Sequence, residues 1–143
     1  MLRTYSPKKT ESSSIEVAVL VDMMAASATE GVPYQLAESL RNIMNFPKTT
    51  YASRLLDIDP RTYRRFESRG LLSPLASDRA YRLGRLLEEA TKLHGGDEEA
   101  AKDWLLTPNL ALGGARPIDG VRNQPEFDRT IDIIKALDEG AFV

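Results

Sequence analysis

The chain has 143 residues, a formal net charge of −2, 42% hydrophobic and 28% charged residues. It contains no cysteine, which excludes disulfides and thiolate chemistry, and its one histidine argues against a histidine-ligated metal site. No apolar run approaches the ~20 residues that a membrane-spanning helix needs, and the polar start of the chain does not resemble a signal peptide. We therefore expect a cytoplasmic protein with no membrane partner.

Charge is unevenly distributed along the chain. Residues 48–92 hold ten Lys/Arg and six Asp/Glu, whereas residues 93–143 hold five and ten. A basic middle beside an acidic end indicates two partners of opposite character: phosphate for the first and a basic protein surface for the second. Two ordinary solvated faces would produce the same distribution, and that alternative stays open.

The N-terminal third divides into a polar arm and a helical segment. Residues 1–14 are polar and are expected to be disordered, because nothing in them can be buried. Residues 15–47 predict two helices, the first with Ser14 as its N-cap and the second opened by Pro33 and ended by Pro47. We expect this segment to serve as core and dimer scaffold.

Residues 48–93 predict a helix-turn-helix region. Thr49 or Thr50 is a candidate cap for a short first helix. The second helix follows Asp59, a good N-cap, and ends at Gly70, a typical residue just past a helix C-terminus. In a helix-turn-helix, the second helix enters the major groove of DNA, where arginine suits guanine edges and phosphates.

The candidate DNA-binding residues lie on these two helices and are rich in arginine. They are Thr49, Thr50, Arg61, Thr62, Arg64, Arg65 and Arg69. The alternative is a basic helix face that only meets solvent. Because two copies on a palindrome would raise the modest affinity expected of an acidic monomer, we expect a homodimer.

Two further helices precede and follow the Gly95-Gly96 pair. The first, capped by Ser73, has an apolar stripe that is expected to be buried: Leu75, Leu83, Leu86, Leu87, Ala90 and Leu93. The second, capped by Asp97, carries Trp104 on its expected buried side. A last helix, opened by Pro125, has Phe127, Ile131, Ile134 and Leu137 on one stripe.

A loop rich in Pro and Gly, residues 107–117, is too apolar for a solvent linker, so we expect Leu110 and Leu112 to pack. The pattern W-L-x-x-P-N-x-A-L-G-G-x-x-P-x-D, followed by a helix ending in G-x-F, resembles the C-terminal toxin-binding domain of the Xre/MbcA/ParS antitoxins. Upstream residues resemble the helix-turn-helix half of the same family: Thr62, Arg64, Arg65, Leu72, Ser73, Ser77, Asp78 and Arg79.

The resemblance implies an all-α fold and an antitoxin of a type II toxin–antitoxin pair. Residues 94–143 would form the toxin-binding domain, and the partner would be a RES-domain toxin, which resembles ADP-ribosyltransferases and degrades NAD+. The antitoxin would block the toxin's active site and bind its own operator DNA. The implied toxin-binding residues are Trp104, Pro108, Asn109, Leu112, Gly113, Gly114, Pro117, Gly140, Phe142 and Val143. Trp104 and Leu112 are expected to shape the domain, and the tail from Gly140 to reach the toxin's active site.

Residues that would support catalysis are missing from the sequence. The absence of cysteine excludes a Cys/His arrangement, and we interpret the single histidine, His94, as a feature of a helix end and not as a catalytic base. Neither of the common glycine-rich phosphate-loop motifs occurs. We therefore expect a binding protein without a cofactor. Two alternatives to the antitoxin stay open: a stand-alone transcriptional regulator whose C-terminal module only dimerises, and an adaptor for some other protein.

Overall fold

The computed structural model describes residues 7–27 and 29–140. Within these ranges the regular structure is helical, apart from one isolated bridge that pairs Pro33 with Leu71, so the expected all-α class is confirmed. The elements, in chain order, are α1 (Pro7–Ala26), α2 (Tyr34–Met44), α3 (Lys48–Thr50), the π-helical η1 (Tyr51–Leu55), α4 (Pro60–Arg69), α5 (Pro74–Leu93), α6 (Glu98–Leu105), the 3₁₀ turns η2 (Leu110–Leu112) and η3 (Pro117–Val121), and α7 (Gln124–Asp138).

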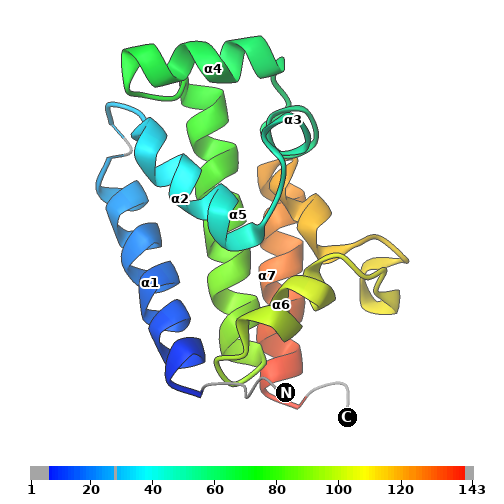
Figure 1. The fold of residues 1–143 in the computed structure, drawn as a ribbon. Coiled ribbons are helices and arrows are strands. Elements are labelled where there is room, and N and C mark those ends of the chain that lie inside the picture. The colour runs from blue at the N-terminus through cyan, green and yellow to red at the C-terminus, as the bar shows by residue number, and fades with distance from the viewer. Residues whose placement is uncertain (1–6, 28, 141–143) are drawn as a thin grey trace.

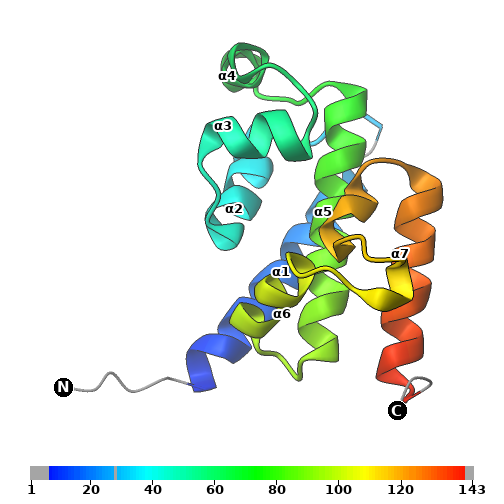
Figure 2. The same ribbon diagram turned by 90° about the vertical axis from the view of Figure 1, so that its right-hand side faces the viewer.

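Helix α5 is the centre of the fold. It packs against α1, α6, α7 and η3, and Figures 1 and 2 show it between α1 and α7 with α4 lying across one end. Its leucines at 83, 86 and 87 are fully buried. A Cβ on Gly84 would lie 3.1 Å from Val21 Cγ2, so the small residue lets α1 approach closely.

Helix α1 begins earlier than the sequence indicated. Pro7 occupies its first position, where a missing N–H costs nothing, so the expectation of disorder is wrong for residues 7–14. Ser14 consequently lies inside the helix and is not its cap. Residues 1–6, the rest of the expected arm, lie outside the described residues.

Most of the predicted helix caps are confirmed. The side chains of Asp59, Ser73 and Asp97 each accept a backbone N–H in the first turn of α4, α5 and α6. The prediction that Thr49 or Thr50 caps the first helix is wrong, because Pro47 takes the N-cap position there, without a side-chain hydrogen bond.

The predicted stripe of α5 is correct except at its start. Leu75 is 76% exposed, while its neighbour Ala76 is fully buried. The buried face runs on through Ala80, Leu83 and Leu87, at helical spacing from Ala76. Leu75 therefore lies on the solvent side of the first turn.

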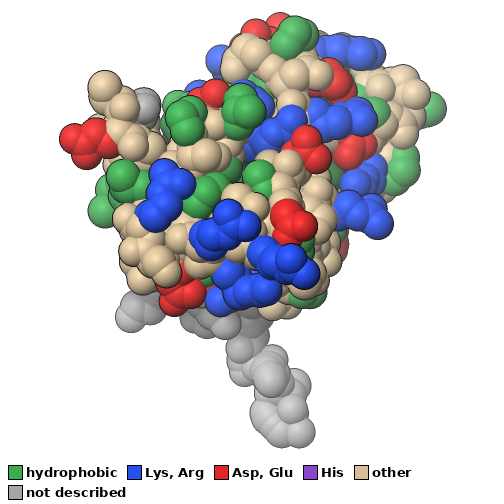
Figure 3. All heavy atoms as spheres, turned by 90° about the horizontal axis from the view of Figure 1, so that it is seen from above, with side chains coloured by type: hydrophobic (Ala, Val, Ile, Leu, Met, Phe, Trp, Pro, Cys, Tyr) green, Lys and Arg blue, Asp and Glu red, His purple; other side chains and the backbone are tan. Residues whose placement is uncertain are grey.

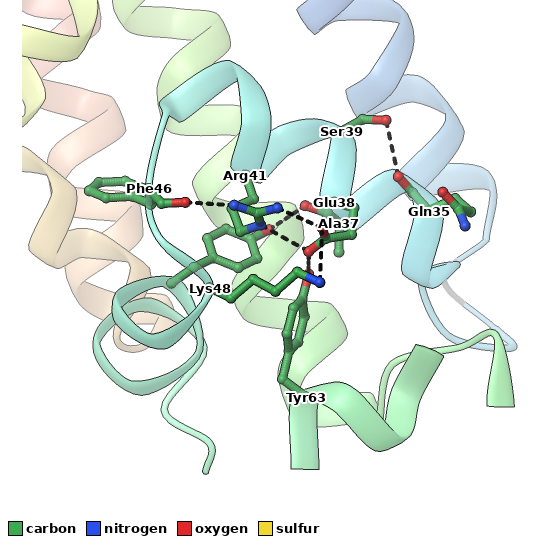
Figure 4. A network of polar contacts seen from close by, with 9 residues as sticks. Gln35, Ala37, Glu38, Ser39, Arg41, Phe46, Lys48 and Tyr63 are labelled. Carbon is green, nitrogen blue, oxygen red and sulfur yellow. Dashed lines mark hydrogen bonds and ion pairs between the residues drawn. The ribbon is translucent and has the colours of Figure 1, made fainter. Parts of the chain in front are cut away.

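A polar network joins α2 to α4 (Figure 4). Arg41 donates two hydrogen bonds to the Glu38 carboxylate, from Nε at 3.0 Å and Nη2 at 2.8 Å, and a third from Nη1 to the carbonyl of Phe46. From α4, the Tyr63 hydroxyl donates to Glu38 Oε2 at 2.5 Å. The carboxylate thus fixes the orientation of α4 relative to α2.

The aromatic rings around this carboxylate bury it further. The Tyr63 ring lies 5.1 Å from that of Tyr34 and 5.7 Å from that of Tyr51, whose hydroxyl donates to the Ala37 carbonyl at 2.8 Å. Burial raises the pKa of Glu38, but the hydrogen bonds from Arg41 and Tyr63 outweigh it, so the pKa lies below its usual value. The pKa of Tyr63 is raised, first by burial and then by its hydrogen bond to Glu38.

We predict that Glu38→Gln destabilises the fold by about 1–3 kcal/mol at neutral pH, because it removes the charge that Arg41 and Tyr63 hydrogen-bond. Folding lowers the pKa of Glu38. The ionised carboxylate therefore stabilises the folded protein at pH values above its unfolded-state pKa of about 4.3, and this stabilisation is lost as the pH falls through the folded-state pKa. Urea unfolding across pH 3–8 measures the free energy of unfolding of both proteins. The difference between the variant and the wild type should become smaller below pH about 4.

The matched control is Glu99→Gln, which weakens an ion pair with Lys102 on an exposed carboxylate. Its effect should stay below about 1 kcal/mol. Equal unfolding free energies for the wild type and Glu38→Gln at pH 7 would show that the network does not stabilise the fold.

Candidate functional site

The first candidate surface is the outer face of α4. Tyr63 and Phe66 are buried, so they hold the helix against the molecule and turn the other side to solvent. Arg61, Arg64 and Arg65 are exposed on that side, and Arg69, also exposed, has its guanidinium carbon 5.5 Å from the centroid of the Phe66 ring. Figure 3 looks down on this end of the molecule, where Lys and Arg side chains gather among fewer acidic ones. The predicted arginines are therefore together on one accessible helix, with Thr62 partly exposed beside them.

Thr49 and Thr50 line a groove next to the C-terminal module. The groove has a volume of about 470 Å³, and its walls include Arg54 from η1 and Leu106, Arg116 and Ile118 from the module. Arg54 is exposed and was missed in the sequence analysis, although its place on the first helix of a helix-turn-helix was a usable signal. The two threonines thus lie where the two halves of the molecule meet.

The second candidate surface is the turn formed by residues 109–115, which Asn109 organises. The Asn109 side chain accepts the N–H of Ala111 at 2.9 Å, and its backbone N–H donates to the Ala115 carbonyl at 3.0 Å. Its own carbonyl accepts from Leu112 and Gly114 at 3.0 and 2.9 Å. Gly113 and Gly114 have φ of 67° and 90°, which closes the turn in a conformation that other residues rarely adopt.

The predicted toxin-binding residues divide into buried and accessible ones. Leu112 and Pro117 are buried, and Trp104 is half-buried with its ring 6.1 Å from that of His94. Pro108, Gly113, Gly114 and Gly140 are exposed, and Asn109 is partly exposed. Phe142 and Val143 lie outside the described residues. The buried members build the module, and the exposed ones are available to a partner.

Leu110 contradicts the expectation that the whole apolar loop packs. Its side chain is 95% exposed, whereas that of Leu112 is 6% exposed. In a 3₁₀ turn, with three residues per turn, residues two apart point in different directions, so only one of the two leucines faces the core. Leu110 is the residue of this surface that sequence reasoning missed.

The module is fastened to the rest of the fold at several points. Arg82 Nε on α5 donates to the Val121 carbonyl at 2.9 Å, and Lys102 Nζ on α6 donates to the Ile43 carbonyl at the end of α2 at 2.9 Å. A Cβ on Gly120 would lie 2.8 Å from Thr130 Oγ1, so η3 and α7 are in close contact. Both candidate surfaces therefore belong to one packed body.

The described residues contain neither a metal-ligand cluster nor a membrane-spanning helix. Between residues 7 and 140, leaving out residue 28, no three His, Cys, Asp or Glu side chains are grouped as metal ligands. In this described part, no helix combines the length and the apolar character needed to cross a bilayer.

The fold and its two surfaces define a helical protein with a helix-turn-helix half and a C-terminal helical module. Two family models match the chain: the antitoxin Xre-like helix-turn-helix domain over residues 23–85, and the antitoxin Xre/MbcA/ParS C-terminal toxin-binding domain over residues 89–140.

Two curated relatives are similar to the chain, and both are named antitoxin Xre. The protein from Yersinia enterocolitica is 30% identical over 125 residues, 87% of this chain and 81% of its own length. The one from Photorhabdus laumondii is 30% identical over 93 residues, 64% of this chain, which spans 62% of that relative. The chain therefore belongs to the Xre antitoxin family, whose members are not enzymes.

Proposed function

We propose that this protein is the antitoxin of a type II toxin–antitoxin pair, which neutralises a RES-domain, NAD+-degrading toxin in the cytoplasm and binds operator DNA to regulate its own expression. The observation that carries the proposal is the presence of a basic helix-turn-helix face and a preorganised turn of the toxin-binding domain on one packed body. A protein that links a toxin to an operator requires both surfaces.

The charge of the C-terminal part supports a toxin of this class. A pocket that binds NAD+ has to accommodate phosphates, so it is expected to be basic, and residues 93–143 carry twice as many acidic as basic side chains. Helix α7 brings the chain to Gly140, from which the apolar residues Ala141, Phe142 and Val143 continue. In the proposal, this tail enters the toxin's active site and excludes NAD+.

The geometry of α4 supports the proposal that the protein binds operator DNA. Its arginines project from a helix whose inner face is fixed by Tyr63 and by the Glu38 network, so they approach DNA without ordering the backbone first. Arginine forms bidentate hydrogen bonds with guanine and with phosphate. We propose that α4 reads the operator from the major groove and that Thr49, Thr50 and Arg54 contact the DNA backbone beside it.

A homodimer would place two copies of α4 on a palindromic operator. An accessible groove of about 990 Å³ between α1, α2 and α6 supports this part of the proposal. Val19 and Met23 on its wall are each about half exposed, which is unusual for large apolar side chains on neighbouring turns of one helix. We propose that this face of α1 is buried between the two copies.

We predict that replacing Arg64 and Arg65 together with Ala lowers affinity for promoter DNA from upstream of the gene by about 100-fold or more, since each good base contact contributes about 1–3 kcal/mol. Neutralisation of the toxin should be unchanged. Gel shifts at several salt concentrations, with Arg122→Ala/Arg129→Ala as a control of equal charge, measure the effect. Unchanged shifts for the α4 variant would exclude α4 as the DNA-contacting helix.

We predict that deleting residues 140–143 abolishes or strongly impairs neutralisation while DNA binding is retained, because the apolar tail would no longer fill the toxin's active site. Growth and cellular NAD+ after toxin induction measure neutralisation. Deletion of residues 1–4 at the other end of the chain is the matched control. Complete rescue by the protein that lacks 140–143 would mean that the tail does not block the active site.

A further inference from the structure

The most exposed large apolar side chain among the described residues is Leu110, at 95%. A single exposed leucine is ordinary on a flexible loop. Leu110, however, lies on the turn that Asn109 closes with four hydrogen bonds: its backbone carbonyl accepts two, its side chain accepts one and its N–H donates one. The backbone at Leu110 is therefore already ordered in the unbound protein.

Buried residues that follow the turn hold it against the core. Leu112, two residues on, is buried, and the chain continues into η3, whose first residues Pro117 and Ile118 are buried and which packs on α5 and α7. Arg82 ties the end of η3 to α5. A rigid support of this kind lowers the entropy cost of binding, which is a property of interface residues that contribute most of the affinity.

The residues next to Leu110 in the sequence are uncharged, and the charged side chains of Arg54 and Arg116 lie in the groove that Leu106 also lines. Leu106 is 39% exposed and Pro108 is exposed, so three apolar side chains alternate along residues 106–110. No Lys, Arg, Asp or Glu occurs between Trp104 and Arg116. Pro108 and Leu110, which do not line the groove of Thr49, Thr50 and Arg54, offer no charge to DNA phosphates, and the segment lies within residues 89–140, the part that matches the toxin-binding domain.

We infer that Leu110, flanked by Leu106 and Pro108, is the affinity anchor of this protein, inserting into an apolar pocket on the toxin outside the toxin's active site. The inference rests on the proposed function and divides it into two tasks. The strip at residues 106–110 holds the toxin, and the tail after Gly140 blocks its chemistry. Loss of the first weakens binding, whereas loss of the second leaves a bound but active toxin.

The test compares how tightly the wild type, Leu110→Asp, Leu110→Met and Leu75→Asp bind a catalytically inactive form of the proposed RES-domain toxin. Leu110→Asp should weaken the Kd by about 100-fold or more, mainly through faster dissociation, because the charge would have to be buried in the pocket. Leu110→Met should stay within about threefold, since it preserves apolar volume. Leu75→Asp places the same charge on another exposed leucine, outside the module, and should bind as the wild type does.

Because Leu110 is exposed, the fold should be intact, which circular dichroism and thermal unfolding verify. Leu110→Asp should still protect cellular NAD+ when it is expressed in large excess, because its tail is unchanged. Wild-type affinity of Leu110→Asp would overturn the inference while the proposed function stands. An equal loss of toxin affinity in Leu75→Asp would also overturn the inference. A change of oligomeric state in Leu110→Asp would overturn it too, because the strip would then bind a second copy of the chain. Failure of the wild type to bind the toxin would overturn the proposed function, and the inference with it.

Discussion

The burial of one continuous face of α5 is the constraint on which the rest of the structure depends. Its leucines at 83, 86 and 87 and its small residues at 76, 80 and 84 form one continuous buried surface. Helix α1 packs on it from one direction, and α6, α7 and η3 from the other. Because the helix-turn-helix half and the C-terminal module both pack on this helix, they share one hydrophobic core.

Two small hydrogen-bonded networks determine which side chains of the packed helices are exposed. Glu38, held by Arg41 and Tyr63, orients α4 so that its arginines face outward. Asn109, through its side chain and backbone, shapes a turn that buries Leu112 and exposes Leu110. In both, a few hydrogen bonds fix a backbone segment so that apolar burial on one side produces an accessible surface on the other.

The sequence predicted the helices and their caps where local chemistry decides them. Asp59-Pro60, Ser73-Pro74 and Gly70 mark helix ends directly, because side-chain capping and positive φ are properties of single residues. The start of α1 was missed because Lys, Thr and Ser are compatible with both helix and disorder. The exposure of Leu75 and Leu110 was missed because it depends on which side of a turn the neighbouring elements cover. The buried Tyr63 and its contact with Glu38 likewise join segments 25 residues apart, a distance that no local pattern reveals.

The measurement that tests the account most directly is co-expression with the protein encoded by the adjacent gene, with pull-down and cellular NAD+ determined in the same cells. We expect a stable complex and a cellular NAD+ level near that of cells without toxin. A RES-domain neighbour that forms no complex, or NAD+ that falls as fast with this protein as without it, would contradict the claim that the C-terminal module neutralises such a toxin.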